Sequence, residues 1–544
     1  MKKSIILTAV LALTLSSCKD DFLERYPEGG TMRQDQYEKL DNQLEGSVRG
    51  LYSKLYTMGG SSHDEFGKRS IDLWGDLLCG DIALRGKTYG WLFSDEQMLT
   101  VNRTGTIWGH YYSQLHNINS TILAFKNGSS LVQDIEDYGW PSEITDGSHM
   151  YTAADTTNAI YYAQALGLRG YIYSQLVKWY TPVLGCEYIK GQTIYDYPCA
   201  PLYTEYNMTV AGSRATSWEI YKQVFSDLET AIKLYDEFGG EYNRANKLEL
   251  DRDVLCGILA MAYLNESVYQ TPEVEAQTEI TQQSILEKAR DYALEVNKNK
   301  YTILPVSELL TNGFNNVANK GWIWGQEVTI EVSGGLKSWF GQVDIHSYSY
   351  AWAGDAKAID DGLWAEAKIW DKRKDWFNDG ETNSVYKLCP DKKFFSADNP
   401  TSTKDDDLDR EWLSDNVFMR IEAMYLIAAE AEWRLGHYDQ AKEHLLAITN
   451  QRVYEDDPMA TNSYQTWCDE LGDPTTLRDA IRYNWRMEMW GEGYGLETFR
   501  RWGIDGKRGG NHIYAAGVTI KPTDSKFNMN IPSSESTYNP NIKK

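Results

Sequence analysis

Apolar side chains recur every three to four residues along most of this chain, which is the spacing of one face of an α-helix. One stripe runs from Tyr37 to Leu55 and a second from Tyr111 to Ile122. Two further stripes cover 254–269 and 284–296. Each pattern lasts three turns or more, so the sequence predicts a mainly α-helical protein.

Two of the predicted helices carry clear boundary signals. The stripe from Ala165 to Leu176 is followed by Pro182, and proline cannot continue a helix. The next helix starts with Thr216 and Glu219 in the spacing of a capping box, in which both side chains accept hydrogen bonds from backbone amides of the first turn. Its predicted buried face runs from Ile220 to Tyr235.

Residues 419–452 form the clearest helical hairpin. A stripe from Met424 to Leu435 precedes Gly436, and a second stripe runs from Tyr438 to Ile448. The segment 435–441 is similar to the turn and second helix of a tetratricopeptide repeat. One such pair cannot bury its own apolar face, so neighbouring hairpins are required. We therefore predict a tetratricopeptide-like helical-hairpin solenoid with loop-rich insertions and short strands.

The pattern changes in the middle of the chain and again near its end. Residues 321–330 alternate between apolar and polar, which predicts a short strand with Trp324 in the core. Residues 398–410 are polar and acidic and predict an exposed loop. We therefore expect an N-terminal helical region at 34–300 with a ligand-loop insertion near 61–106, a loop-rich insertion at 301–415, a C-terminal helical region at 416–503 and an irregular tail at 504–544.

The first 17 residues have the pattern of a signal peptide. Lys2 and Lys3 precede an apolar run from Ile5 to Leu15, which is too short to span a bilayer. Residues 15–18, Leu-Ser-Ser-Cys, resemble a bacterial lipobox, which implies cleavage before Cys18 and its acylation, with palmitate among the expected chains. An ordinary signal peptide with an incidental cysteine is the alternative. We expect an outer-membrane lipoprotein with a tether at 18–33.

The tether carries a second address signal. Lys19, Asp20 and Asp21 resemble the acidic signal that directs some bacterial lipoproteins to the outer leaflet. Acidic residues beside a lipid anchor do not favour binding to an anionic membrane surface. A solvated linker with accidental charges would have the same composition. We therefore expect the protein to be exposed at the cell surface.

Charge and cysteine content exclude several classes of protein. The net charge of −24 argues against nucleic-acid binding, which needs Lys and Arg to neutralise phosphates. The six cysteines other than Cys18 lack CxxC spacing, so no zinc or thioredoxin site is indicated. Cys186 and Cys199 bracket a short loop and could pair, but their connectivity is open.

The aromatic residues favour polar partners. The chain has 19 Trp and 37 Tyr against 14 Phe. Trp and Tyr combine an apolar ring with a polar tip, which suits surfaces that are partly apolar and partly wet. Sugar rings offer C–H faces for stacking and hydroxyls for hydrogen bonds, although helix packing accounts for most of these residues, including Trp108.

Several motifs, in the same order along the chain, resemble the SusD/RagB family of outer-membrane nutrient-binding lipoproteins. The resemblance covers nearly the whole chain, and its most specific motif is residues 420–431, Arg-Ile-Glu-Ala-Met-Tyr-Leu-Ile-Ala-Ala-Glu-Ala. The other matching segments are 21–24, 163–171 with Trp179-Tyr180, 201–203, Arg214, 220–231, 486–493 with 500–502, and 531–541. One departure is 494–498, where the family more often has an arginine, so the local ion-pair pattern is open.

The resemblance implies a non-enzymatic lipoprotein at the cell surface. Such a protein takes up glycan, or in some members peptide, as the lid of a SusC-like TonB-dependent transporter. Family members bind ligand with insertion loops, whose residues vary. By position, the glycan-binding candidates here are Trp74, Asp81, Arg85, Tyr89, Trp91, Trp339, Tyr348, Tyr350 and Trp352. Each of them is as compatible with the core as with a ligand site, and Glu422, Arg486 and Glu488 are expected to be ion pairs that fix helix packing.

Catalysis is not indicated by any motif. A glycosidase needs two carboxylates at a fixed separation, but a chain with 78 acidic residues contains many candidate pairs, so their presence is no evidence for a glycosidase. No nucleophile elbow, HExxH or P-loop is present in the sequence. Asp405, Asp407 and Asp409 begin like a calcium loop, but Arg410 and Asn416 stand where it needs Gly and Glu. We therefore expect no catalytic residue, metal or cofactor. The alternatives to glycan uptake are a scaffold that recruits other surface lipoproteins, a peptide-uptake subunit and, with less support, a glycosidase.

Overall fold

The computed structural model describes residues 43–60, 62–86, 90–92, 104–140, 151–206, 211–240, 242–296, 300–346, 348–381, 384–395 and 413–542. The chain forms two compact units, Met1–Gly46 and Ser47–Lys544. The signal peptide, Cys18, Tyr89 and the acidic segment 398–410 lie outside the described residues. The second unit carries every feature discussed below.

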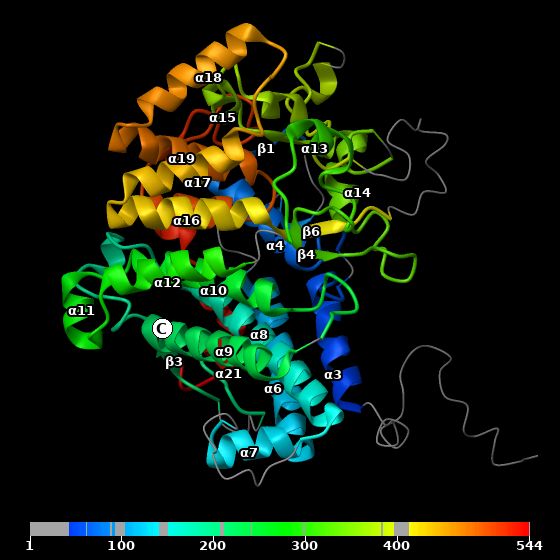
Figure 1. Ribbon diagram of the computed structural model, residues 1–544, viewed down its shortest axis with the longest axis vertical. Coiled ribbons are helices and arrows are strands. Elements are labelled where there is room, and N and C mark those ends of the chain that lie inside the picture. Colours follow the sequence, from blue (N-terminus) through cyan, green and yellow to red (C-terminus); the bar gives the residue numbers. More distant parts are fainter. Residues whose placement is uncertain are drawn as a thin grey trace, which may run out of the picture. The chain divides into compact units, whose positions relative to one another are not determined.

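Long helices pack on one another in chain order, as Figure 1 shows from cyan α6 to orange α19. Helix α8 packs against α6 and α9, α10 against α9 and α12, α12 against α16, and α16 against α17 and α19. This series is the predicted stack of helical hairpins. Its members are α6 (Thr104–Gly128), α8 (Ala153–Tyr180), α9 (Ser217–Phe238), α10 (Arg252–Ser267), α12 (Gln282–Glu295), α16 (Ile421–Leu435), α17 (Tyr438–Thr449) and α19 (Pro474–Glu488).

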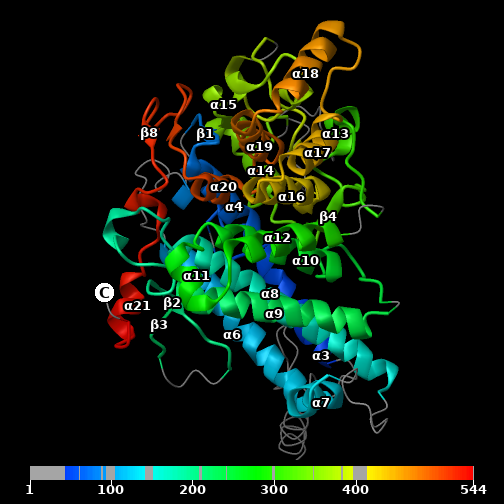
Figure 2. The same cartoon turned by 60° about the vertical axis from the view of Figure 1, so that its left-hand side comes forward.

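Short elements fill the insertions and the tail (Figure 2). The described strands form antiparallel pairs: β1 (Ile82–Leu84) with β5 (Lys357–Ile359), β2 (Pro198–Pro201) with β3 (Arg214–Thr216), β4 (Trp322–Gln326) with β6 (Asn416–Arg420), and β7 (Gly506–Lys507) with β8 (Thr519–Ile520). The shorter α-helices are α3 (Gln43–Leu51), α4 (Lys68–Cys79), α7 (Ser130–Tyr138), α11 (Pro272–Thr278), α13 (Val306–Asn312), α14 (Trp339–Val343), α15 (Asp361–Glu366), α18 (Pro458–Glu470), α20 (Gly495–Trp502) and α21 (Ser533–Tyr538).

The predicted helix boundaries are confirmed where local chemistry sets them. Helix α8 ends at Tyr180, two residues before Pro182. The Thr216 backbone amide donates to Glu219 Oε2 at 2.7 Å, and the Glu219 amide donates to Thr216 Oγ1 at 3.1 Å, which completes the capping box. The predicted strand at 321–330 is shorter than expected, because the Val328 amide donates to the Asp415 side chain at 2.8 Å instead of to a neighbouring strand.

The hairpin of α16 and α17 has the predicted turn. Gly436 has φ = 82°, a left-handed conformation that ends α16 and that glycine adopts without steric cost. Met424 and Ala441 are buried as predicted, but Tyr438 is 41% exposed, so its assignment to the buried stripe was wrong. Tyr438 is the first residue of α17, and burial of that helix begins one turn later at Ala441.

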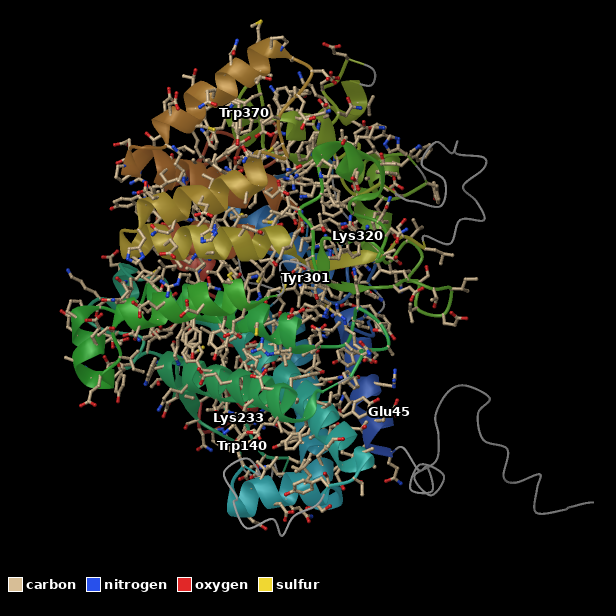
Figure 3. The ribbon with its side chains drawn as sticks, in the orientation of Figure 1. Glu45, Trp140, Lys233, Tyr301, Lys320 and Trp370 are labelled. Carbon is tan, nitrogen blue, oxygen red and sulfur yellow. The ribbon has the colours of Figure 1, made fainter. Side chains whose placement is uncertain are left out.

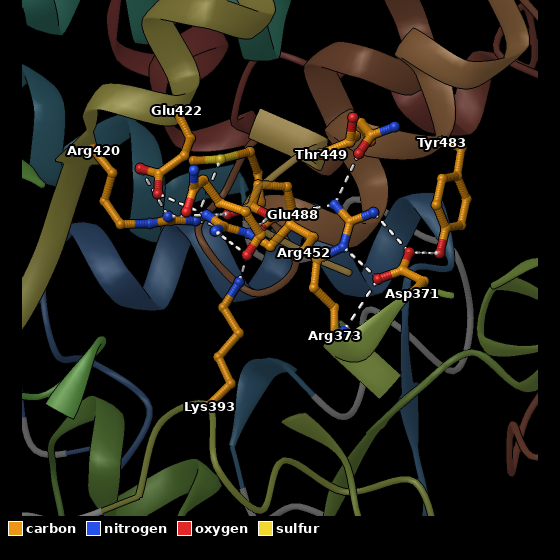
Figure 4. A network of polar contacts seen from close by, with 12 residues as sticks. Asp371, Arg373, Lys393, Arg420, Glu422, Thr449, Arg452, Tyr483 and Glu488 are labelled. Carbon is orange, nitrogen blue, oxygen red and sulfur yellow. Dashed lines mark hydrogen bonds and ion pairs between the residues drawn. The ribbon is translucent and has the colours of Figure 1, made fainter. Parts of the chain in front are cut away.

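A fully buried ion network joins the C-terminal helices to the insertion (Figure 4). Glu488 of α19 accepts hydrogen bonds from Arg373 at 3.2 Å, Arg420 at 3.1 Å and Arg452 at 2.9 Å. Burial alone would raise the pKa of Glu488, but these guanidinium groups hold it well below its usual range. Glu422 pairs with Arg420 and Arg452, each at 2.9 Å. Both acids therefore fix helix packing, as predicted.

Many aromatic residues serve packing. The indole ring of Trp370 lies 4.8 Å from the ring of Tyr464 and 4.9 Å from that of Trp467 on α18, near the top of Figure 3. The ammonium of Lys233 on α9 lies 4.1 Å from the ring centroid of Trp140 (Figure 3). Trp108 and Trp324 are buried, as predicted. Among the described residues, no helix combines the length and apolar character needed to cross a membrane.

Candidate functional site

The two predicted insertions meet in the structure, and the residues that pair are more than 270 positions apart in sequence. Strand β1 pairs with β5, and the Arg85 amide extends this ladder by donating to the Ala356 carbonyl at 2.9 Å. Beyond the ladder, Gly86 approaches the other segment so closely that an added Cβ would lie 1.8 Å from the carbonyl oxygen of Gly354. One surface is therefore built from both insertions.

Half-buried rings gather on this surface, and we call them the aromatic patch: His63, Tyr348, Tyr350, Trp352 and Tyr386. The rings of His63 and Tyr350 lie 4.3 Å apart at an angle of 30°. The rings of Tyr348 and Trp352 lie 5.8 Å apart, edge to face. The Tyr386 hydroxyl donates to the Trp352 carbonyl at 2.8 Å, which joins a third segment to the patch.

The backbone around the patch is held by local hydrogen bonds. The Tyr350 amide donates to the Gly341 carbonyl of α14 at 2.8 Å, and the Trp352 amide donates to Ser349 Oγ at 3.0 Å. The guanidinium of Arg85, which is half-buried, donates to the Lys387 carbonyl next to Tyr386. Arg85 and the rings are thus positioned by the same segments.

Buried polar groups lie below the patch. Lys357 Nζ donates to Gln342 Oε1 at 2.9 Å, and Gln342 Nε2 donates to the His63 carbonyl at 3.1 Å. Burial lowers the pKa of Lys357 to about 8. Burial also raises the pKa of Asp355 to about 6, and its Oδ2 has no hydrogen-bond partner in the described part of the chain. Asp355 Oδ2 is therefore a buried acceptor without a hydrogen-bond partner among the described residues.

Three of the predicted ring residues are placed in the core. Trp74 is 0% exposed and stacks on Trp179 with ring centroids 4.8 Å apart, and Trp91, 2% exposed, packs edge-on against Trp74 at 5.3 Å. Trp339 is 1% exposed and lies under the Arg69 guanidinium at 3.9 Å. A sugar cannot stack on a ring whose two faces are covered, so we correct their assignment and remove these three indoles from the candidate site.

Asp81 is also buried, and its role is local. Its carboxylate accepts from Arg486 Nε at 2.7 Å, and its backbone carbonyl accepts from the Trp490 indole at 2.9 Å. Burial raises the pKa of Asp81, and the Arg486 charge opposes that rise. Asp81 does not join the aromatic patch, whereas Tyr348, Tyr350 and Trp352 belong to it. Arg85 is linked to the patch through the Lys387 carbonyl next to Tyr386.

His63, Tyr386 and Asp355 were missed by the sequence-based prediction. All three lie in segments without a helical or strand period, so no periodic signal distinguished them. Among the described residues, no group of three or more His, Cys, Asp or Glu side chains is arranged to hold a metal ion. Cys186 and Cys199 are both free thiols: Cys186 Sγ lies 3.0 Å from the Thr523 carbonyl, and Cys199 contacts Thr181.

Comparisons with known proteins agree with this architecture. The model of the SusD family matches residues 314–542. A SusD-like protein of Bacteroides ovatus is 25% identical over 299 residues, which are 55% of this chain and 45% of that protein. The aligned part therefore spans less than half the length of that relative.

Two solved structures establish the fold over almost the whole chain. A SusD-like carbohydrate binding protein from Bacteroides vulgatus is 21% identical with a TM-score of 0.66, and the match covers 92% of this chain and 97% of that one. Surface glycan-binding protein A from Bacteroides thetaiotaomicron, in complex with laminarihexaose, is 14% identical with a TM-score of 0.61, covering 91% of this chain and 97% of that one. Residues 314–542 of this chain therefore match the SusD family, and almost the whole chain shares the fold of the two solved structures.

Proposed function

We propose that this protein captures carbohydrate at the aromatic patch and does not cleave it. The observation that carries the proposal is the meeting of two distant insertions, which links Arg85, through its hydrogen bond to the Lys387 carbonyl, to the segment of Tyr386 and Trp352. Ligand sites commonly combine aromatic walls with a few polar groups that fix orientation. Ring faces would stack on sugar C–H groups, and Arg85 and Asp355 would bond to hydroxyls.

The proposal includes a cellular role. Acylated Cys18 would anchor the protein to the outer membrane with its patch outward, and a SusC-like TonB-dependent transporter would receive the glycan. The lipobox pattern and the match of residues 314–542 to the SusD family model support this role. The related surface glycan-binding protein was crystallised with laminarihexaose, which supports a glycan as the ligand class here. No nucleic acid partner is proposed.

A surface scaffold that recruits other lipoproteins, or a peptide-uptake subunit, is the alternative. A scaffold would need no aromatic patch with an adjacent guanidinium, whereas glycan capture does. Copurification with a transporter-sized membrane protein would favour delivery. Release of reducing sugar by the purified protein would contradict a purely binding role.

Affinity electrophoresis in gels that contain different polysaccharides tests capture. We expect at least one glycan to retard the protein, and Trp352→Ala to weaken that binding by about two- to tenfold, because one stacked ring contributes about 0.5–1.5 kcal/mol. Tyr538→Ala is the matched control, since Tyr538 is 85% exposed and outside the patch. Equal losses in both variants, or no retardation by any glycan, would contradict the proposal.

A further inference from the structure

A second, polar cavity of about 560 Å³ lies between α4, α15, α19, α20 and the segment 504–510. It shares no lining residue with the aromatic patch. Its volume falls within the range of about 300–1,000 Å³ that is typical of small-molecule sites. The lining residues that matter here are Asp81, Glu366, Arg482, Arg486, Thr498 and Trp502.

Arg482 Nε, Thr498 Oγ1 and Trp502 Nε1 belong to this wall and have no hydrogen-bond partner in the described part of the chain. Thr498 is 1% exposed, so bulk water does not reach it freely. Buried donors without acceptors are uncommon in native proteins, because each loses its hydration and gains nothing. A ligand that carries acceptor oxygens would satisfy all three.

The two arginines of α19 differ in their partners. Arg486 pairs with Asp81 at 2.7 Å and with Glu366 at 3.5 Å. Arg482, one turn earlier, forms no ion pair within the described residues, and its pKa is lowered by burial and by the neighbouring charge of Arg486. The charges of Glu366, Asp479 and Asp81 partly oppose this lowering of the pKa, but none of them forms an ion pair with Arg482 among the described residues. A guanidinium that forms no ion pair and lies beside a second guanidinium is a position that an anion would stabilise.

Four of the five carboxylates of the wall already have donors, and Asp81 and Glu366 share Arg486. Asp360 accepts from the Gly509 amide at 2.6 Å and from the His512 ring at 3.0 Å. Asp361 accepts from the Gly510 amide at 2.9 Å. The wall therefore offers donors rather than acceptors. The wall has more acidic than basic residues, which disfavours a ligand with two negative charges, so a ligand with a single negative charge fits best. The acidic residues are Asp81, Asp360, Asp361, Glu366 and Asp505, and the basic residues are Arg482, Arg486, Lys507 and Arg508.

We propose that this cavity binds a small monocarboxylate, an acidic sugar or a hydroxy acid, with its carboxylate on Arg482 and its other oxygens on Thr498 and Trp502. Arginine matches a carboxylate with two parallel hydrogen bonds. The Phe499 and Trp502 rings supply an apolar side to the same cavity.

Isothermal titration calorimetry of the full-length protein, purified in detergent, tests this site at pH 7 and one ionic strength. The titrants are D-glucuronate, L-lactate, D-glucose and inorganic phosphate. Tighter binding of glucuronate assigns the ligand to acidic sugars, and equal binding of lactate assigns it to hydroxy acids. No binding of either carboxylate, or tighter binding of phosphate, would overturn the proposal.

Variants separate this cavity from the aromatic patch. Arg482→Gln should raise the Kd for the carboxylate at least tenfold, and Arg478→Gln should leave it unchanged, because Arg478 lies one turn earlier on α19, outside the cavity, and pairs with Asp479. Thr498→Val removes only the unpartnered hydroxyl and should weaken binding several-fold without loss of thermal stability.

Trp352→Ala should leave carboxylate binding intact while it weakens any binding of glucose, so failure of this site and failure of glycan capture are distinguishable. If Arg482→Gln and Thr498→Val both leave the Kd unchanged, the cavity is not the binding site. A loss in Arg478→Gln equal to that in Arg482→Gln would overturn the assignment as well.

Discussion

Glu266 of α10 shows how one buried side chain can make the stability of the whole protein depend on pH. It is 0% exposed, one carboxylate oxygen accepts from Gln270 Nε2 at 2.6 Å, and the other has no partner in the described part of the chain. Burial raises the pKa of Glu266 to about 8, against 4.5 for an ordinary glutamate. The folded protein therefore keeps a proton that the unfolded chain releases.

The sign of this effect follows from proton uptake. Between pH 4.5 and about 8 the folded state binds more protons at Glu266 than the unfolded state, so its contribution to stability falls as the pH rises through this window. Glu266→Gln removes that loss. We expect the variant to gain on the order of 2–4 kcal/mol over the parent between pH 4.5 and pH 8.5, as measured by urea unfolding.

Glu470 provides the control for this pH effect, because its side chain is exposed at the end of α18. Glu470→Gln should change the free energy of unfolding equally at both pH values. A Glu266→Gln variant whose pH dependence matches that of the parent would contradict a protonated Glu266.

Among the helices, the hairpin of α16 and α17 depends on the conformation of a single residue. An added Cβ on Gly436 would meet no atom within 4 Å, so the cost of a side chain there is confined to the backbone. The left-handed conformation at φ = 82° costs other residues about 1–2 kcal/mol. We therefore expect Gly436→Ala to lower the free energy of unfolding by about that amount in urea titrations.

Gly109 inside α6 is the matched opposite case. It too has no atom within 4 Å of an added Cβ, but it lies in the middle of a regular helix. Gly109→Ala should raise the free energy of unfolding by about 0.5–1 kcal/mol, because alanine favours helix. Equal signs for the two changes would mean that the turn does not require a left-handed residue.

At the scale of the molecule, the buried ion network ties the solenoid to the insertion that carries the patch. Arg420 and Glu422 lie where β6 runs into α16, Glu488 ends α19, and Arg373 and Lys393 come from the insertion. Lys393 donates to Glu492 at 2.8 Å and to the Glu488 carbonyl at 2.8 Å. The position of the insertion thus depends on charges that are all out of contact with water.

Removing the central acid should unfold this arrangement. Glu488→Gln leaves the buried guanidinium groups of Arg373, Arg420 and Arg452 with less counter-charge, and breaking one partner of a buried pair costs about 3–5 kcal/mol. Urea unfolding should show that loss. Asp479→Asn removes the exposed partner of Arg478 and should stay within about 0.5 kcal/mol of the parent.

Local signals account for the part of the fold that could be predicted. Each of these signals acts within a few residues of the chain, so its effect can be predicted from the sequence. They are the spacing of apolar residues, the Thr216 capping box, Pro182 and Gly436. The length of β4 was overestimated, because the Val328 amide beyond its end donates to Asp415, almost 90 residues away, instead of to a neighbouring strand. A hydrogen bond to a residue so far along the chain cannot be predicted from the local pattern of apolar and polar residues.

The sequence by itself determined the helices, their hairpin order and the resemblance to one family, because these rest on periodicity and on short motifs. Only the tertiary structure decided which rings face outward: Trp74, Trp91 and Trp339 are covered, while Tyr348, Tyr350 and Trp352 remain half-buried. It also decided that two insertions share a ladder and that Arg482 Nε has no hydrogen-bond partner among the described residues. Exposure and pairing depend on residues hundreds of positions away, and no local spacing encodes them.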